Sequence, residues 1–367
     1  MARSPLSALS SLGTFSAILS VLREVDVRPA RIAAETPFLI AFVSRDAQLA
    51  EHLAALMYRG DRPADTPPYR TAIGAPITDA APISRANVVV IVTRDAPPRL
   101  DEALRLKRAL EASNTPVLMC LVQERSAPPP APSVTSGHAV TLPLDDGALD
   151  EQTAIERLTA AIRQLNAIDD LALARHLPAF RAPVVRALIE DVAVANATYS
   201  LGSGLLQINP ATGLPVAVAD TVILTKNQAI MAYKIALAMG LPADFKHIMP
   251  QIAGVIGGGL IFRQVARLAI GWLPGLGIAP KVAIAFAGTF AIGEAIYRWS
   301  QAGEWLTEDG LRAIYALALE RGKALAAGLR QRRVSRPAKA KAKPNPPEQA
   351  MIALPPSPSH NGAARPH

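Results

Sequence analysis

The chain has 367 residues, a formal net charge of +8, a single cysteine, and hydrophobic residues at half of its positions. This length is enough for two domains with sizeable cores. A single cysteine excludes an intrachain disulfide framework and fits a reducing compartment. Because Cys120 lies in an apolar run, we predict that it is a buried structural thiol rather than a nucleophile.

Residues 1–36 are expected to form an N-terminal amphipathic helix and a linker. Leu12, Phe15, Leu19 and Leu22 follow one another at helical spacing. Serines interrupt the apolar run, and no small-residue cleavage site follows it, so the pattern does not predict a signal peptide.

In residues 37–168, short apolar runs alternate with amphipathic segments. We predict strands at residues 38–43, 87–92, 116–122 and 138–142, and helices at residues 47–58, 100–112 and 150–165. Continuous apolar strands separated by helices indicate a parallel sheet that is covered on both faces. The fold class predicted here is therefore a three-layer α/β domain.

The order of these elements resembles the G domain of Era-like GTPases. The first, fourth, fifth and sixth strands of that layout would begin near Phe38, Asn87, Val117 and Ala139. The resemblance covers roughly a third of the chain and implies a GTPase-like, three-layer α/β domain.

The three motifs that carry GTPase chemistry are absent from the expected places. A phosphate-binding loop needs glycines and a lysine after the first strand, but residues 44–51 read SRDAQLAE, in which Asp46 and Glu51 would repel phosphate. Residues 78–81 (TDAA) lack the glycine of DxxG, and residues 121–124 (LVQE) stand where NKxD should follow. We therefore expect a pseudo-GTPase domain, a degenerate P-loop fold with no catalytic, cofactor-binding or metal-binding residues.

Residues 169–330 are predicted to form an all-α domain, because the strand pattern disappears. Helices are expected at residues 184–201, 219–239 and 308–330, with Gly240 as a C-terminal cap and Thr307 as an N-terminal cap. Polar residues inside the second helix are expected to form a solvated or headgroup-facing stripe; these are Lys226, Asn227, Gln228 and Lys234.

The most apolar part of the chain, residues 247–299, is predicted to be a helical hairpin. Each arm has an uncharged run of about a dozen residues, which rises ~18 Å and is short of the ~30 Å hydrocarbon core of a bilayer. A span becomes feasible if Lys281 and Arg298 extend to the interface. The alternative is that the hairpin is the core of a soluble bundle. The residues that mark the hairpin are Gly254 and Gly258 of a GxxxG motif, Trp272, Pro274, Gly275 and Gly277 of the hinge, the small-residue series Ala283, Ala287 and Ala291, and Trp299.

Several stretches of this region together resemble the family known as domain of unknown function 697. They are RHLPAFR at 175–181, GLP at 213–215, TKNQAIM at 225–231 and LPGLG at 273–277. The resemblance implies a membrane-associated module that commonly follows an Era-like GTPase domain, and it implies no catalytic residues. The residues that carry it in the second helix are Lys226, Asn227, Gln228, Met231 and Gly240.

Residues 331–367 are predicted to be a disordered tail, since they are rich in proline and carry seven basic residues and one acidic residue. Such a tail can hold anionic lipid headgroups or serve only to solubilise the chain. Nucleic-acid binding is not expected, because no interleaved aromatic residues or binding fold accompany the tail.

The sequence as a whole predicts a non-enzymatic scaffold or interaction protein at the cytoplasmic face of a membrane, either integral or peripheral. The expected partners are membrane lipid with anionic headgroups and an unidentified protein, with a second copy of the chain as a further candidate. No cofactor is expected. Two alternatives remain open: a soluble, cytoplasmic two-domain binding protein with the hairpin as core, and an unorthodox GTPase.

Overall fold

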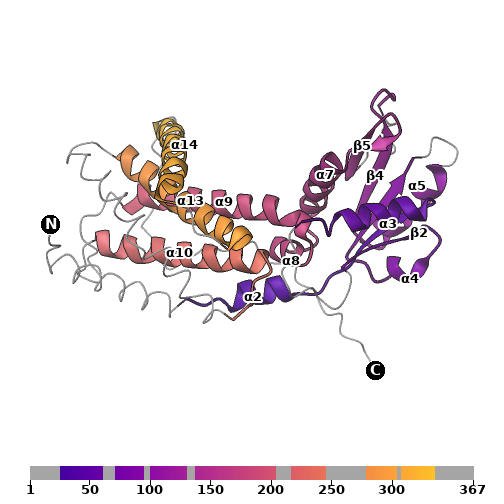
Figure 1. The fold of residues 1–367 in the computed structure, drawn as a ribbon, viewed down its shortest axis with the longest axis horizontal. Coiled ribbons are helices and arrows are strands. Elements are labelled where there is room, and N and C mark those ends of the chain that lie inside the picture. The colour runs from indigo at the N-terminus through magenta and orange to yellow at the C-terminus, as the bar shows by residue number, and fades with distance from the viewer. Residues whose placement is uncertain are drawn as a thin grey trace.

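The computed structural model describes residues 25–60, 71–94, 100–129, 137–203, 216–244, 278–303 and 307–334. Together they form an α/β unit followed by a region of several long helices (Figure 1). This arrangement confirms the predicted order of an α/β part and an all-α part.

The α/β unit is built on a six-stranded sheet with the strand order β2-β1-β3-β4-β5-β6. Neighbouring strands from β2 to β5 are parallel, and β6 is antiparallel to β5. The strands are β1 (Ile40–Ser44), β2 (Ala72–Pro76), β3 (Val88–Thr93), β4 (Val117–Glu124), β5 (Ala139–Asp145) and β6 (Ala148–Leu149).

Helices cover both faces of this sheet, as the continuous apolar strands predict. Alternate residues of β3 face opposite sides: Val90 belongs to the core cluster that includes Leu53 and Leu158, whereas Ile91 belongs to the cluster that includes Leu110. The helices of this unit are α3 (Ala47–Leu56) and α7 (Glu151–Gln164) on the first side, and α4 (Ala80–Ile83) and α5 (Leu100–Ala112) on the second.

Two strands of the sheet, β2 and the short β6, are not among the predicted strands, and the edge strand β2 has an unfavourable sequence. It reads AIGAP, and glycine and proline are both poor strand residues. Gly74 is nevertheless required, because a Cβ there would lie 2.2 Å from the backbone nitrogen of Glu51 in α3. The close approach of α3 and β2 therefore depends on a residue without a side chain.

The pair Asp146 and Gly147 forms the turn between β5 and β6. Their φ angles are +52° and +79°, and Asp145 pairs with Ala148 across the turn. This is the geometry that an Asp-Gly pair favours in a two-residue hairpin.

Four long helices dominate the described part of the helical region, and α13 lies at its centre. It packs against α9, α10 and α14. The helices of this region are α8 (Asp170–His176), the 3-10 helix η1 (Pro178–Phe180), α9 (Arg181–Ser203), α10 (Val216–Ala238), α13 (Ile278–Ala302) and α14 (Glu308–Val334). The predicted cap of α14 is confirmed, because the backbone N–H of Gly310 donates to Oγ1 of Thr307.

The short helix α2 (Arg28–Glu35) precedes β1 in the chain but packs against α8 and α10. Its buried residues Ala30 and Ala34 join the same core cluster as residues of the helical region. The α/β unit is thus flanked in sequence by elements of the helical region.

Within the described ranges, no helix combines the length and the apolar character needed to cross a membrane. The predicted amphipathic helix at residues 12–22 lies outside those ranges, as do the first arm and the hinge of the hairpin with Gly254, Gly258, Trp272, Pro274, Gly275 and Gly277. Helix α14 continues to Val334, four residues beyond its predicted end, and the rest of the basic tail lies outside the described residues.

Candidate functional site

The place where a phosphate-binding loop would follow β1 is occupied by a side-chain cap. Helix α3 begins at Ala47, directly after Asp46, and the Asp46 carboxylate accepts a hydrogen bond of 3.1 Å from the backbone N–H of Leu49. Ser44 Oγ accepts a further bond of 3.2 Å from the backbone N–H of Asp46. A helix N-terminus attracts anions through its free N–H groups and its dipole. Here that position is taken by the protein's own carboxylate.

An ion pair ties the same edge of the sheet to helix α5. Arg45 donates to Glu102 at 2.6 Å and so links the end of β1 to the first turn of α5, which also carries Asp101. In doubly wound sheets, ligands bind beside the strands at which the order reverses, which here are β1 and β3. Through the Arg45–Glu102 pair, the acidic first turn of α5 lies near that point.

The other candidate groups of the α/β unit have structural roles. Cys120 is fully buried in β4, as predicted, and burial raises the pKa of its thiol well above the usual range. Asp145 pairs with Arg125 at 2.8 Å, and this hydrogen bond lowers the pKa of the Asp145 carboxyl. No group of three potential metal ligands occurs within the part of the chain that the structure describes.

Gly240 ends α10 as predicted. Its φ is +81°, its N–H donates to the carbonyl of Leu237, and the N–H of Leu241 donates to the carbonyl of Ala236. This is the Schellman pattern, which needs a left-handed residue. Arg175 of α8 also donates to the carbonyls of Leu237 and Leu241, at 3.2 and 2.9 Å. Arg175 and Gly240 thus fix one helix end.

The neighbouring residues of the RHLPAFR stretch join the two parts of the molecule. The ring of His176 packs edge-on against Phe38, which precedes β1, with 5.8 Å between ring centroids. The N–H of Ala179 donates to the carbonyl of Met57 at the end of α3, and Phe180 is fully buried. Burial lowers the pKa of His176 below its usual value.

A buried network of polar side chains connects the middles of α9, α10 and α13. The amide of Asn227 donates to Oδ1 of Asn196 at 2.7 Å, and the amide of Asn196 donates to Oγ1 of Thr289 at 2.9 Å. Gln228 donates to the same hydroxyl at 3.3 Å. Because these groups satisfy one another, the network can fix the register of three apolar helices.

The expectation of a solvated polar stripe on α10 is therefore wrong for two of its members. Asn227 is 5% exposed and Lys234 is 8% exposed, while Lys226 is half-buried. The sequence alone did not predict this because the partners Asn196 and Thr289 lie on other helices. Met231 is fully buried in the core of the same region.

The small-residue series of the second hairpin arm lies inside the protein. Ala283, Ala287 and Ala291 are fully buried, whereas Trp299 is half-buried. A Cβ at Gly322 of α14 would lie 2.8 Å from the carbonyl oxygen of Ala283, so the two helices meet at backbone distance. The series thus serves close helix packing within the chain.

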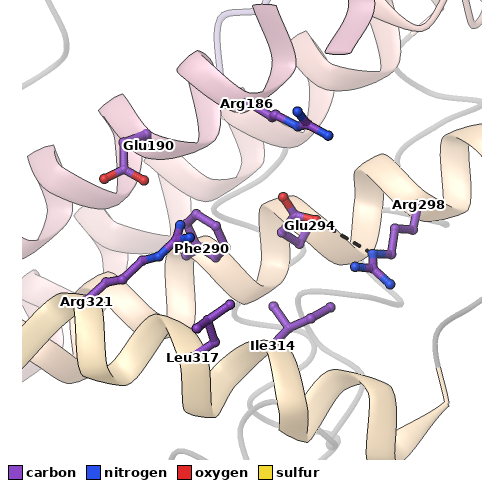
Figure 2. A pocket seen from close by; sticks show the side chains of 8 residues that line it. All are labelled: Arg186, Glu190, Phe290, Glu294, Arg298, Ile314, Leu317 and Arg321. Carbon is purple, nitrogen blue, oxygen red and sulfur yellow. Dashed lines mark ion pairs between the residues drawn. The ribbon is translucent and has the colours of Figure 1, made fainter. Parts of the chain in front are cut away.

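A cavity of about 360 Å³ opens between α9, α13 and α14 (Figure 2). It combines apolar and charged side chains. Glu294 pairs with Arg298 at 3.7 Å, and the Arg321 guanidinium lies over the ring of Phe290, 5.4 Å from its centroid. The lining residues are Arg186, Glu190, Phe290, Glu294, Arg298, Ile314, Leu317 and Arg321. No sequence motif marks this site, because its residues come from three helices, and α9 is far from α13 and α14 in the chain.

The chain matches no family model, no curated protein and no solved structure.

Proposed function

We propose that the protein is a non-enzymatic, membrane-associated scaffold in which a pseudo-GTPase-like α/β unit is coupled to a membrane-docking helical region. The observation that carries the non-enzymatic part is the Asp46 carboxylate on the N-terminus of α3. A nucleotide phosphate would have to displace this cap and would then lie beside the acidic first turn of α5.

The joint between the two parts supports a scaffold. The contacts of His176 with Phe38 and of Ala179 with Met57 tie the helical region to the start of β1 and the end of α3. A bidentate pair between Arg163 of α7 and Asp170 of α8 adds a third connection, at 2.6 to 3.1 Å. Such contacts would hold two binding surfaces in a fixed relation.

The way the long helices pack supports membrane docking. Backbone-distance contacts at glycines and hydrogen bonds between Asn, Gln and Thr side chains are means by which helices associate in lipid. The apolar stretch 252–262 and the basic tail supply a docking segment and an electrostatic attachment.

A soluble two-domain binding protein is the second candidate, and one observation favours it. Ala283, Ala287, Ala291 and Ala295 are all buried against the protein's own helices, as a soluble bundle requires. The two candidates differ in the environment of residues 252–262.

Fractionation of the full-length protein tests the membrane assignment. Deleting the whole hairpin would also remove α13, which packs against three helices, so two substitutions in the first arm, Val255→Glu and Leu260→Glu, are the better perturbation. We expect the wild type to leave the membrane pellet only in detergent and the double variant to move to the supernatant. Arg108→Glu on the exposed side of α5 is the control. A wild type that stays entirely in the supernatant would establish the soluble alternative.

A hydrolysis assay tests the non-enzymatic assignment. With GTP and with ATP, and with a known GTPase as positive control, we expect no turnover above the rate without protein. Turnover that disappears on Arg45→Ala would instead establish an unorthodox GTPase whose phosphate contact is Arg45.

A further inference from the structure

The cavity between α9, α13 and α14 has the form of a groove with a floor and two walls. Phe290, Glu294 and Arg298 are spaced four apart on α13 and so share one face of that helix, which forms the floor. Glu190 belongs to the α9 wall and Leu317 to the α14 wall, on opposite sides of the floor in Figure 2. Because α13 packs against both other helices, it lies between them.

The groove has an apolar centre and a charged rim. Phe290 and Ile314 are half-buried, and Leu317 is 57% exposed. Arg186 and Arg321 are exposed at the rim. An apolar centre within a polar rim is the anatomy of a protein interface, and arginine is frequent among residues that dominate binding energy.

The charges of the rim favour a protein segment over a lipid headgroup or a free anion. Three arginines line the groove, but Glu190 and Glu294 lie among them and would repel a ligand that is uniformly negative. A helix can place an acidic side chain at each arginine and a basic or neutral one at each glutamate. Since arginines outnumber glutamates, the best-matched helix carries a net negative charge.

We propose that this groove binds one amphipathic helix of a partner protein. The apolar face of that helix would cover Phe290, Ile314 and Leu317, and its acidic residues would pair with the rim arginines. A helix packs at 8–10 Å from its neighbours, and it would lie here as a fourth helix on the layer formed by α9, α13 and α14. This inference rests on the proposed scaffold function and names the chemistry of one of its partners.

Two synthetic helical peptides provide the test. Both have about 18 residues, which is about 27 Å of helix, and carry leucines on one face. One has glutamates beside the leucines, and the other has lysines at the same positions. With full-length protein at low salt, we expect fluorescence anisotropy to give at least about tenfold tighter binding of the glutamate peptide, and a smaller difference at high salt.

Variants locate the binding in the groove. Arg298→Glu combined with Arg321→Glu should reverse the preference, so that the lysine peptide binds more tightly. Leu317→Ala should weaken both peptides about fivefold without changing the preference, because it removes apolar contact and no charge. Arg108→Glu reverses the charge of an exposed residue on α5 and should change neither the peptide affinities nor the preference. Circular dichroism should show that each variant is folded.

Three outcomes would overturn the proposal: neither peptide binds, both bind equally, or the glutamate preference survives the double reversal. Phosphatidylserine vesicles serve as a further probe, since vesicle binding that the double reversal abolishes, without peptide binding, would make the groove a lipid site. The peptide assay contains no membrane. Its failure would therefore leave the fractionation result intact, and a soluble protein that binds the peptide would refute only the membrane part of the proposed function.

Discussion

At the scale of single residues, Asp46 and Asn196 show how side chains satisfy polar groups of the protein itself. Asp46 gives the α3 N-terminus the negative partner that a phosphate gives to a nucleotide-binding loop. Asn196 gives three apolar helices a specific polar contact. Neither residue faces a ligand in these contacts, so both act on the protein itself.

Asn196→Ala should lower the free energy of unfolding by about 2 kcal/mol or more. The change leaves the buried amide of Asn227 without its acceptor, and the hydroxyl oxygen of Thr289 loses the hydrogen bond that it accepts from Asn196. Urea denaturation measures this, with Gln164→Ala on the exposed end of α7 as the control, expected within about 0.5 kcal/mol of the wild type. If the two variants lose the same free energy of unfolding, the network is not a stabilising feature.

His176 should make the protein less stable as the pH falls. Because burial lowers its pKa in the folded state, the unfolded chain binds a proton more readily, and unfolding becomes easier below the usual histidine pKa of about 6.5. Thermal melts between about pH 8 and 5 should show a smaller loss for His176→Gln than for the wild type. His138→Gln, at an exposed position, should behave as the wild type does.

At the scale of elements, close backbone approach decides the packing of the helical region. The α13 and α14 pair meets at Gly322, and α9 and α13 meet at Gly293, where a Cβ would lie 2.7 Å from the Ile189 side chain. Both glycines are inside helices, where glycine has a conformational cost, so the contact they permit must outweigh that cost.

Gly322→Val and Gly328→Ala form a matched pair on α14. A Cβ at position 322 would lie 2.8 Å from a backbone oxygen, so the valine should cost about 1–3 kcal/mol or more. A Cβ at position 328 meets nothing within 4 Å, so alanine there should stabilise the helix by up to about 1 kcal/mol. Chemical denaturation compares them, and a stabilising Gly322→Val would mean that α14 does not pack on α13 in this way.

Local patterns in the sequence predict the elements of the α/β unit well but not their contacts. The helix at 100–112 is confirmed, because amphipathic periodicity is a local property. The strand β2 is missed, since AIGAP becomes a strand only by pairing with β1. The groove and the polar network depend on α9 and α13, which are about a hundred residues apart, so no local pattern shows them.

At the scale of the whole molecule, the two parts share one hydrophobic core cluster. It extends from Phe42 of the sheet through Phe180 of η1 to Phe286 of α13. Since no gap in apolar packing separates the α/β unit from the helical region, we expect them to unfold together.

A single cooperative transition should therefore appear in two independent probes. All three tryptophans lie at or beyond residue 272, so their fluorescence reports the helical region, while the accessibility of the buried Cys120 thiol reports the sheet. Tryptophan fluorescence and pulsed thiol labelling should give the same denaturant midpoint. Two midpoints would mean that the shared core does not couple the parts.

The position of α2 has a consequence for synthesis on the ribosome. This helix packs on α8 and α10, but the whole α/β unit is translated between them. At about 5–20 residues per second, α2 must wait on the order of ten seconds for its partners, while the sheet is already able to form. During that interval Ala30 and Ala34 have no helix to cover them, so α2 can reach its native packing only after α8 and α10 have been synthesised.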